Sequence, residues 1–542
     1  MPSLAFIAVI LGSTVLLIIY KAIIHPALLS PLSRIPNAHW TSAISPAWIL
    51  WTRFRSRENR EVHAAHQRLG SVVRLGPNEI SVNCLDGGVR TVYGGGFEKG
   101  QWYTIFDNYG VPCMFSSLQS RPHSARKRMI SNVYSKSTIN TSKALTSQSI
   151  VILYSRLLPI LHASADESKS SNGVEVHELW NATTMDFITA YQFGLANSSN
   201  FLEDVSHRQH WLSLYQSRKA HTFFPQELPR FTKLLHGVGI RLFPSWVDDA
   251  NRSLETWCAD MCKVTKAYGL SQESYESNPY DEPVVLNAVL AGIEKEKRTK
   301  GSESILNDTT LKKPRLSIAS EMIDQLAAGH ETSGVTLTYL TWHLSHDISL
   351  QNALRAELLD LDFPLKYPAT VPLKDVRLPD PKQLDGLPIL HSVLMETLRL
   401  DAAIPGSQPR MTPYPSCIIG GYDVPGGVRV SSAAYSLHRN GGVFPDPEKW
   451  DHTRWLDDNG SKEQGASEAK MNRDRYFWAF SSGGRMCVGS NFAMHELKLV
   501  AAAIYTNFTT HVVDDEGIEQ MDGYTCGPKS NKLSLRFEKV GT

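Results

Sequence analysis

A ten-residue segment near the C-terminus, Phe480–Gly489, places one cysteine inside a glycine-rich loop (FSSGGRMCVG). Helical periodicity follows from Phe492 to about Tyr505, so Cys487 lies just before a helix. Glycines allow positive φ and let the backbone approach a flat partner closely. A helix N-terminus and Arg485 should lower the pKa of the thiol and favour the thiolate. The segment predicts a thiolate metal ligand, against the alternative of a buried structural cysteine.

A second unusual segment is a long apolar stretch from Ile318 to about Ser345. It is apolar on all sides, which predicts a helix through the core. The run Ala328–Ser333 (AGHETS) puts a glycine, at a cost of about 1 kcal/mol, and an ionisable glutamate inside this helix. Both are expected if a groove opens there for small molecules such as dioxygen and water. The alternative is a glycine kink beside a solvated glutamate.

The cysteine loop resembles the haem-binding loop of the cytochrome P450 family. The defining positions are filled by Phe480, Gly483, Arg485, Cys487 and Gly489. The family's other landmarks follow in order over nearly the whole chain after the N-terminal apolar run. The resemblance implies a mainly α fold with small β-sheets (α+β), the cytochrome P450 fold. It also implies haem b (iron protoporphyrin IX), with Cys487 as the axial ligand of the iron.

The long helix would then carry the proton relay. The resemblance implies that the hydroxyl of Thr332 hydrogen-bonds the activated oxygen and that Glu331 helps to deliver protons to it.

A structural ion-pair network is implied by the same resemblance. Glu396 and Arg399 are three apart on one helix face, a spacing that alone indicates an ordinary surface pair worth about 0.5 kcal/mol. In the family such a pair locks onto an arginine, here Arg454, behind the haem. The family usually has Pro-Glu before that arginine, whereas this chain has His452-Thr453. The lock is therefore expected to contain one carboxylate fewer.

Basic residues are expected to bind the haem propionates. The candidates are Arg485, Arg410, His123 and Lys127. The family usually has arginine at the position of Lys127, and a lysine still neutralises a propionate as a point charge. The alternative for this basic cluster is a solvated helix face.

The N-terminal run Leu4–Tyr20 contains no charged residue, and its apolar character continues through Ile24. That length suits a transmembrane helix better than a cleaved signal peptide, because no basic residue precedes it and Lys21 and Arg34 follow it. The positive flank predicts a single-pass anchor in the endoplasmic reticulum membrane with the catalytic domain in the cytosol.

The expected domains are an anchor over 1–24, a proline-rich linker over 25–40 that does not continue the helix, and one haem-thiolate catalytic domain over 41–542. Ser71–Val82 predicts a β-hairpin, Val284–Lys297 a short helix, and Ser461–Asn472 a surface insertion.

The net charge and the cysteine content argue against a nucleic-acid-binding protein and against a disulfide-rich protein. The net charge is +1, so no nucleic-acid partner is expected, and seven scattered cysteines are not a disulfide framework. The glycines of Gly94–Gly100 do not follow the dinucleotide-binding pattern, and Cys258 with Cys262 indicates core packing.

The resemblance implies a monooxygenase that inserts one oxygen atom from O2 into a lipophilic small molecule. Its style, with RLGPNEISV and a short anchor, is similar to fungal microsomal P450s of secondary-metabolite biosynthesis. Electrons would come from NADPH-cytochrome P450 reductase, with cytochrome b5 as a second donor. The alternative function is a reductase-independent haem-thiolate isomerase or dehydratase. Such enzymes often lack the acid–alcohol pair, which in this chain is Glu331 and Thr332.

Two surfaces follow from family positions. The substrate pocket is expected to take residues from 101–118, 208–239, 402–408, 524–527 and the start of the long helix, with aromatic rings from Phe106, Tyr109, Phe115 and Phe223. The docking face for an acidic redox partner is expected at Arg126, Arg128 and Lys136.

Overall fold

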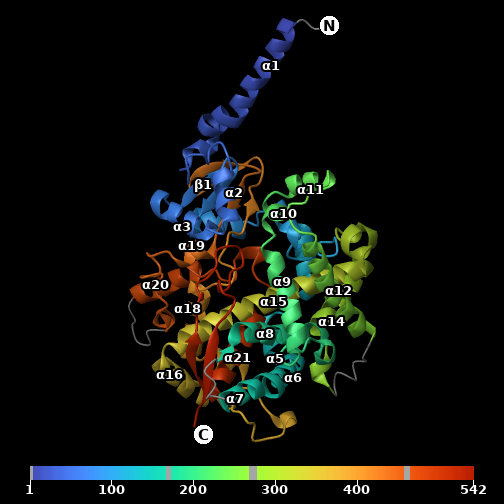
Figure 1. The fold of residues 1–542 in the computed structure, drawn as a ribbon, viewed down its shortest axis with the longest axis vertical. Coiled ribbons are helices and arrows are strands. Elements are labelled where there is room, and N and C mark those ends of the chain that lie inside the picture. The colour runs from blue at the N-terminus through green and yellow to red at the C-terminus, as the bar shows by residue number, and fades with distance from the viewer. Residues whose placement is uncertain (1–3, 167–172, 268–277, 457–463, 542) are drawn as a thin grey trace.

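The computed structural model describes residues 4–166, 173–267, 278–456 and 464–541 (Figure 1). Helices dominate, as the sequence predicts. They are α1 Leu4–Ile19, α2 Ala47–Phe54, α3 Glu58–Leu69, α4 Ser120–Ile130, α5 Lys136–Thr141, α6 Lys143–Val151, α7 Leu158–Asp166, α8 Val176–Phe193, α9 Val205–Lys219, α10 Phe223–Glu227, α11 Pro229–Gly237, α12 Trp246–Ala267, α14 Val284–Lys300, α15 Pro314–Ser345, α16 Ile348–Leu359, α17 Pro381–Asp385, α18 Pro388–Leu400, α19 Ala434–His438, α20 Gln464–Tyr476 and α21 Ser490–Asn507.

Small antiparallel and mixed sheets complete the fold. The strands are β1 Val72–Gly76, β2 Glu79–Val82, β3 Val174–Glu175, β4 Arg410–Met411, β5 Ser416–Ile419, β6 Tyr422–Pro425, β7 Arg429–Ser431, β8 Phe508–Asp514 and β9 Ser534–Lys539. They form sheets in the orders β1-β2-β7-β4, β3-β9-β8 and β5-β6. β1 and β2 pair antiparallel, which confirms the hairpin expected at Ser71–Val82. The mainly α fold with small sheets is thereby confirmed.

The long helix α15 runs through the core, as expected, and begins four residues before the predicted Ile318. α8 packs along it. A side chain at Gly329 would place its Cβ 2.8 Å from Ile188 of α8, and one at Gly334 would lie 2.9 Å from Asn181. The missing side chain of Gly329 therefore allows two core helices to approach each other closely, while the groove expected in this segment stays a prediction.

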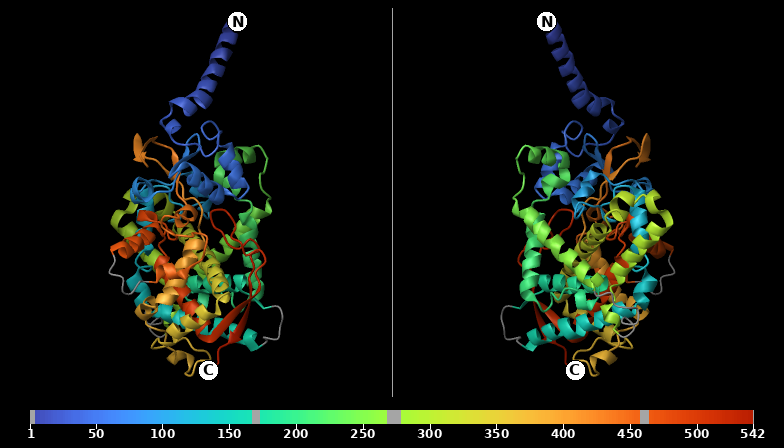
Figure 2. Two further views of the ribbon diagram at one scale, coloured as in Figure 1. Left: turned by 90° about the vertical axis from the view of Figure 1, so that its left-hand side faces the viewer. Right: turned by 90° about the vertical axis from the view of Figure 1, so that its right-hand side faces the viewer.

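The N-terminal helix projects away from the body, and none of its candidate membrane span Val9–Leu29 is buried (Figures 1 and 2). After α1 the backbone continues as a π-helix, Tyr20–Leu29, which contains Pro26. The expected linker is therefore helical over its first residues, because the wider π-turn accommodates a proline that lacks an N–H donor. The fully buried Arg74 of β1 donates a hydrogen bond of 2.9 Å to the Pro26 carbonyl and so joins the helix to the body.

Other expected elements are found with shifted ends. The short helix predicted over Val284–Lys297 extends to Lys300 as α14. Part of the expected insertion Ser461–Asn472 lies outside the described residues, and its remainder belongs to α20. Cys258 is fully buried in the core and Cys262 packs partly against it, which confirms their packing role.

One carboxyl group in the core has a clear thermodynamic consequence. Glu496 of α21 is 1% exposed, and the side chain of Ser333 interacts with its carboxyl group without offsetting the burial. Burial raises the pKa of Glu496 well above its usual range. The folded protein therefore retains this proton to a higher pH than the unfolded chain, which releases it above its ordinary pKa of 4.5.

We predict that Glu496→Gln changes the pH dependence of stability. As pH rises through the unfolded pKa, the unfolded wild-type chain loses a proton that the folded chain retains. The free energy of unfolding of the wild type should therefore fall, relative to the variant, by about 1.4 kcal/mol per pH unit. Urea unfolding between about pH 5 and about pH 7 measures this difference. Parallel stability curves for the two proteins would contradict it.

Candidate active site

The cysteine loop folds back on the N-terminal part of the chain and leads directly into α21. The backbone N–H of Cys487 donates to the Phe480 carbonyl at 3.0 Å, which closes the loop. Gly483 has a φ of +73°, and a Cβ there would lie 2.1 Å from the Tyr93 carbonyl oxygen, so only glycine fits. The close approach at Gly483 is thus to protein backbone. At Gly489 a Cβ would meet no atom within 4 Å, so open space lies beside the cysteine.

The thiol of Cys487 is exposed, yet the surrounding protein atoms desolvate it and raise its pKa. This combination describes a residue that faces a hollow within the molecule. The expectation of a lowered pKa is wrong for the protein alone, because burial outweighs the backbone hydrogen bond from Gly489 and the charge of Lys127. A bound metal ion would supply the missing stabilisation of the thiolate.

One face of α15 borders a hollow. Between Ser317 and Thr341, a fully described run, every residue is buried except Asp324, Ala327, Ala328, Gly329, Glu331 and Thr332. Asp324, Ala328 and Thr332 are spaced by four residues and so share one face of the helix. An uncovered face in the middle of a core helix indicates a cavity, and Ala328 is the most open of these positions.

The acid–alcohol pair points to two different partners. The Thr332 hydroxyl donates a 2.7 Å hydrogen bond to the Ala328 carbonyl. The Glu331 carboxylate forms an ion pair with Lys219 of α9 and accepts a 3.0 Å hydrogen bond from the Tyr215 hydroxyl. Burial alone would raise the pKa of Glu331, but the Lys219 ammonium holds it below its usual range. Glu331 is therefore ionised and held on the α9 side of the helix.

Four predicted basic residues and one unpredicted lysine gather around the hollow. Burial, followed by the charges of Arg485, Lys99, Lys127 and Arg410, lowers the pKa of His123 to about 3. Burial, Arg410 and Arg485 likewise lower the pKa of Lys99 well below its usual range. The charges of Arg410 and Arg485 thus destabilise the charged forms of His123 and Lys99.

The hydrogen bonds of this cluster leave capacity for a ligand. Arg485 donates to the carbonyls of Ser117 and Leu118, but its buried Nε has no partner among the described residues. Lys127 donates to the Gly484 carbonyl at 2.9 Å. Among the residues that the structure describes, the carboxylate that pairs with Arg485 is the half-exposed Glu98 at 3.1 Å. The buried cations therefore outnumber the carboxylates that contact them.

The predicted ion-pair network is complete and buried. Glu396 and Arg399 of α18 are each fully buried and 2.8 Å apart, so this is not an ordinary surface pair. Glu396 also accepts hydrogen bonds from the Arg454 and Trp455 side chains at 3.3 and 2.8 Å and from the Asp451 backbone N–H at 2.8 Å. One carboxylate thus serves four donor groups.

Comparisons with known proteins agree with this geometry. The family model for cytochrome P450 matches residues 49–535. The chain belongs to the cytochrome P450 family. Similar proteins include the cytochrome P450 monooxygenases hkm5 of Aspergillus hancockii (25% identical, covering 96% of this chain and 93% of the relative) and orf2 of Aspergillus niger (23%, 96% and 96%). The monooxygenase stcB of Emericella nidulans is 24% identical over 94% of this chain and 90% of its own length.

This cytochrome P450 is an oxidoreductase whose family carries a haem-thiolate cofactor, and its residues fit that group. Cys487 faces open space, which a flat ring system can fill. The surplus of buried cations and the unpartnered Nε of Arg485 match the two propionate carboxylates of a haem. The uncovered face of α15 leaves room for small molecules.

Sequence reasoning missed two residues of the P450 site. Lys99 lies near enough to Asp324, Arg410 and Arg485 to interact electrostatically with all three, so it links the cation cluster to α15. Its Nζ donates to the Phe115 carbonyl at 2.6 Å. Nothing in the sequence around Lys99 indicates that this lysine is buried. The second missed residue is Asp324, which resembles an ordinary helix residue eight positions before Thr332.

Two of the four aromatic residues expected in the substrate pocket, Phe106 and Phe115, lie in one group of rings. Phe106 and Phe115 pack edge to face at 5.1 Å, and Tyr103 and Tyr524 extend the same group of rings. Tyr109 instead binds Glu255 of α12 through its backbone and hydroxyl groups. Phe223 packs against rings of the surrounding segments, Phe54 and Phe224.

The predicted docking face needs a correction at Arg126. Arg126 is 5% exposed and donates to the hydroxyls of Ser117, Thr309 and Thr310, so it cannot contact a partner protein. Arg128 and Lys136 are exposed.

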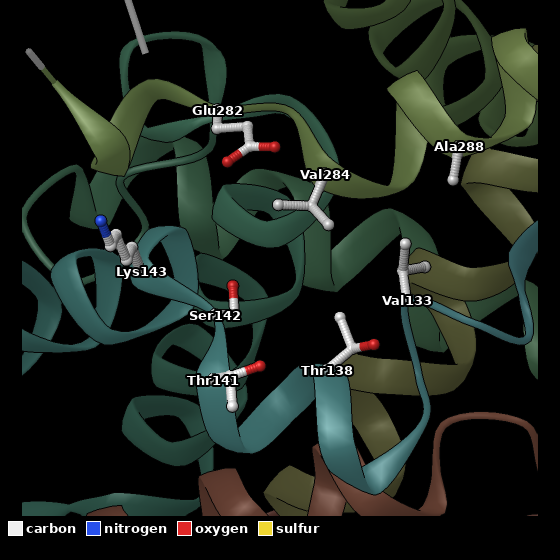
Figure 3. A pocket seen from close by; sticks show the side chains of 8 residues that line it. All are labelled: Val133, Thr138, Thr141, Ser142, Lys143, Glu282, Val284 and Ala288. Atoms are coloured by element: carbon white, nitrogen blue, oxygen red, sulfur yellow. The ribbon is translucent and has the colours of Figure 1, made fainter. Parts of the chain in front are cut away.

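A separate hollow of about 530 Å³ lies between α5, α6 and the start of α14 (Figure 3). It is lined by Val133, Thr138, Thr141, Ser142, Lys143, Glu282, Val284 and Ala288. None of the site residues above belongs to it.

We predict that Glu396→Gln destabilises the fold by about 3–5 kcal/mol, because it leaves Arg399 and Arg454 buried without a counter-charge. Urea unfolding gives the free energy of unfolding. Glu448→Gln is the matched control: Glu448 is 67% exposed and pairs with Arg439, so the loss should stay below about 1 kcal/mol. Equal losses in the two variants would show that the Glu396 network does not stabilise the fold.

Proposed function

We propose that this cytochrome P450 is a haem-thiolate monooxygenase that inserts one oxygen atom from O2 into a lipophilic small molecule. The observation that carries the proposal is the exposed Cys487 thiol beside open space, next to basic side chains that outnumber the carboxylates contacting them among the described residues. A structural cysteine would be covered by apolar side chains and would need no such cations.

The cofactor we propose is haem b, with Cys487 as its axial ligand. Phe480, Gly483 and Gly489 shape the loop around the sulfur. The propionates would be held by the basic cluster, namely Arg485, Arg410, His123, Lys127 and Lys99. When bound, the haem supplies the redox chemistry that activates dioxygen.

Proton delivery is proposed for the acid–alcohol pair of α15. Glu331 would receive a proton at its carboxylate on the α9 side, where Lys219 and Tyr215 now hold it. Water in the hollow would carry that proton to the Thr332 hydroxyl, which then donates toward the hollow instead of to Ala328. The intact pair favours oxygen activation over the reductase-independent isomerase or dehydratase reaction.

The membrane and partner assignments extend this proposal. We propose a single-pass anchor over 1–24, a linker over 25–40 and a catalytic domain over 41–542, with the catalytic domain on the cytosolic face of the endoplasmic reticulum. NADPH-cytochrome P450 reductase would supply electrons, with cytochrome b5 as a second donor. The exposed Arg128 and Lys136 would contribute positive charge to the docking face.

The pathway we propose is fungal secondary-metabolite biosynthesis. Its support is the likeness to monooxygenases of Aspergillus and Emericella over most of their length. The group of rings formed by Tyr103, Phe106, Phe115 and Tyr524 supports a lipophilic substrate.

We predict that the reduced wild-type protein with carbon monoxide shows a strongly red-shifted Soret band and that Cys487→His abolishes it. The shift would need a thiolate ligand to the haem iron, which Cys487 would supply, and imidazole is a neutral ligand. Cys417→His, at a partly exposed cysteine in β5, is the matched control and should keep the band. Persistence of the band in Cys487→His would disprove the ligand assignment. Product formation without NADPH and reductase would favour the isomerase or dehydratase reaction.

A further inference from the structure

The uncovered face of α15 carries a carboxyl group that the proton relay does not use. Asp324 lies on the same face as Ala328 and Thr332, and eight residues of helix separate its Cα from that of Thr332 by about 12 Å. Asp324 is partly exposed, although the residues on both sides of it, Ile323 and Gln325, are buried. Its carboxyl group therefore belongs to the wall of the hollow.

A neighbouring acid shows what a structural carboxylate looks like in this helix. Glu321, one turn earlier, accepts hydrogen bonds from the Gln325 amide at 2.9 Å and from the Met114 backbone N–H at 2.8 Å. Asp324 has no comparable partners. In the described part of the chain it forms no ion pair within contact distance; its polar neighbours are the thiol of Cys113 and the ammonium group of Lys99, which acts on it through its charge. A carboxyl group left so incompletely paired has capacity for a ligand.

The groups around Asp324 define the chemistry that it can bind. Its own desolvation and the charge of Glu321 raise the pKa of Asp324 to about 8, so the empty site favours the neutral acid. A bound cation would restore the carboxylate and form a charge-assisted hydrogen bond, which is about twice as strong as a neutral one.

The aromatic wall beside Asp324 also suits a cation. The Lys99 ammonium lies 4.0 Å from the centre of the Tyr103 ring and 3.7 Å from that of Phe115. Aromatic faces attract cations, so these two rings present a suitable surface to a nitrogen cation, although burial, Arg410 and Arg485 lower the pKa of Lys99 itself. In the haem-bound protein the two propionates would offset the charges of Lys99, Arg410 and Arg485. The carboxyl groups of Glu321 and Asp324 would then be the local source of negative potential.

We propose that Asp324 is a substrate-positioning residue that binds a protonated amine of the substrate and holds that nitrogen two helical turns from Thr332. The inference rests on the proposed function and deepens it: the substrate is a lipophilic amine whose hydrocarbon end extends along α15 toward Thr332. The oxidised carbon is then remote from the nitrogen.

The direction of the Soret shift on adding n-decylamine tests this proposal. A free amine that reaches the iron ligates it and moves the band to longer wavelength. An amine held by Asp324 presents its hydrocarbon end, displaces water and moves the band to shorter wavelength. We expect the shorter-wavelength shift in the wild type and the longer-wavelength shift in Asp324→Leu.

Matched variants separate charge from shape. Asp324→Asn keeps the size of the side chain but cannot ionise, and it should weaken the shorter-wavelength binding of decylamine by about tenfold or more. Asp308→Leu, at an exposed acid paired with Lys312, should behave as the wild type. n-Decanol, which is neutral, should bind equally to the wild type and to Asp324→Asn.

Three results would overturn the proposal. They are a longer-wavelength shift with decylamine in the wild type, unchanged decylamine affinity in Asp324→Asn, and a preference for decanol that Asp324→Leu removes, which would indicate a hydroxyl-bearing substrate. The red-shifted carbon monoxide band is recorded for every variant. Its loss in all proteins would refute the haem-thiolate function itself, whereas its presence assigns any failure to Asp324.

Discussion

The tight packing of α8 on α15 is the constraint on which the site depends. Glycine at positions 329 and 334 brings the two helices together, and most residues of α15 between Ser317 and Thr341 are buried in the core. A helix fixed in this way along most of its length holds its remaining open face in place. The residues of that face, Asp324, Glu331 and Thr332, therefore have fixed spacings, which positions them for chemistry without a flexible loop.

Much of the fold and of the candidate site can be predicted from the sequence, because some residues are energetically unfavourable in their local setting unless they have a function. A cysteine among glycines, a glycine and a glutamate inside an apolar helix, and an acid–base pair on one face of α18 each conflict with ordinary packing. The hairpin over Ser71–Val82 follows from its turn residues. These features locate Cys487, Glu331, Thr332 and Glu396 before any coordinates are considered.

The remaining features depend on which segments meet in space, and no local pattern encodes that. Arg126 and Lys127 are adjacent in the sequence, yet the first is buried against hydroxyl groups and the second reaches the cysteine loop. The pKa of Cys487 depends on how many protein atoms surround the sulfur, a quantity that the neighbouring residues do not reveal. Lys99 becomes part of the cation cluster because the tertiary fold brings its segment beside Arg410 and Arg485.

The hydrogen bond between Arg74 and the Pro26 carbonyl restrains the joint between the N-terminal helix and the globular body. Without this bond, the helix could rotate relative to the globular body about the proline-containing segment. With the arginine fully buried and the π-helix ending only at Leu29, a tilt of the helix within a bilayer would carry the whole body with it. Lipid thickness would thereby set the angle at which the enzyme meets other proteins on the same surface.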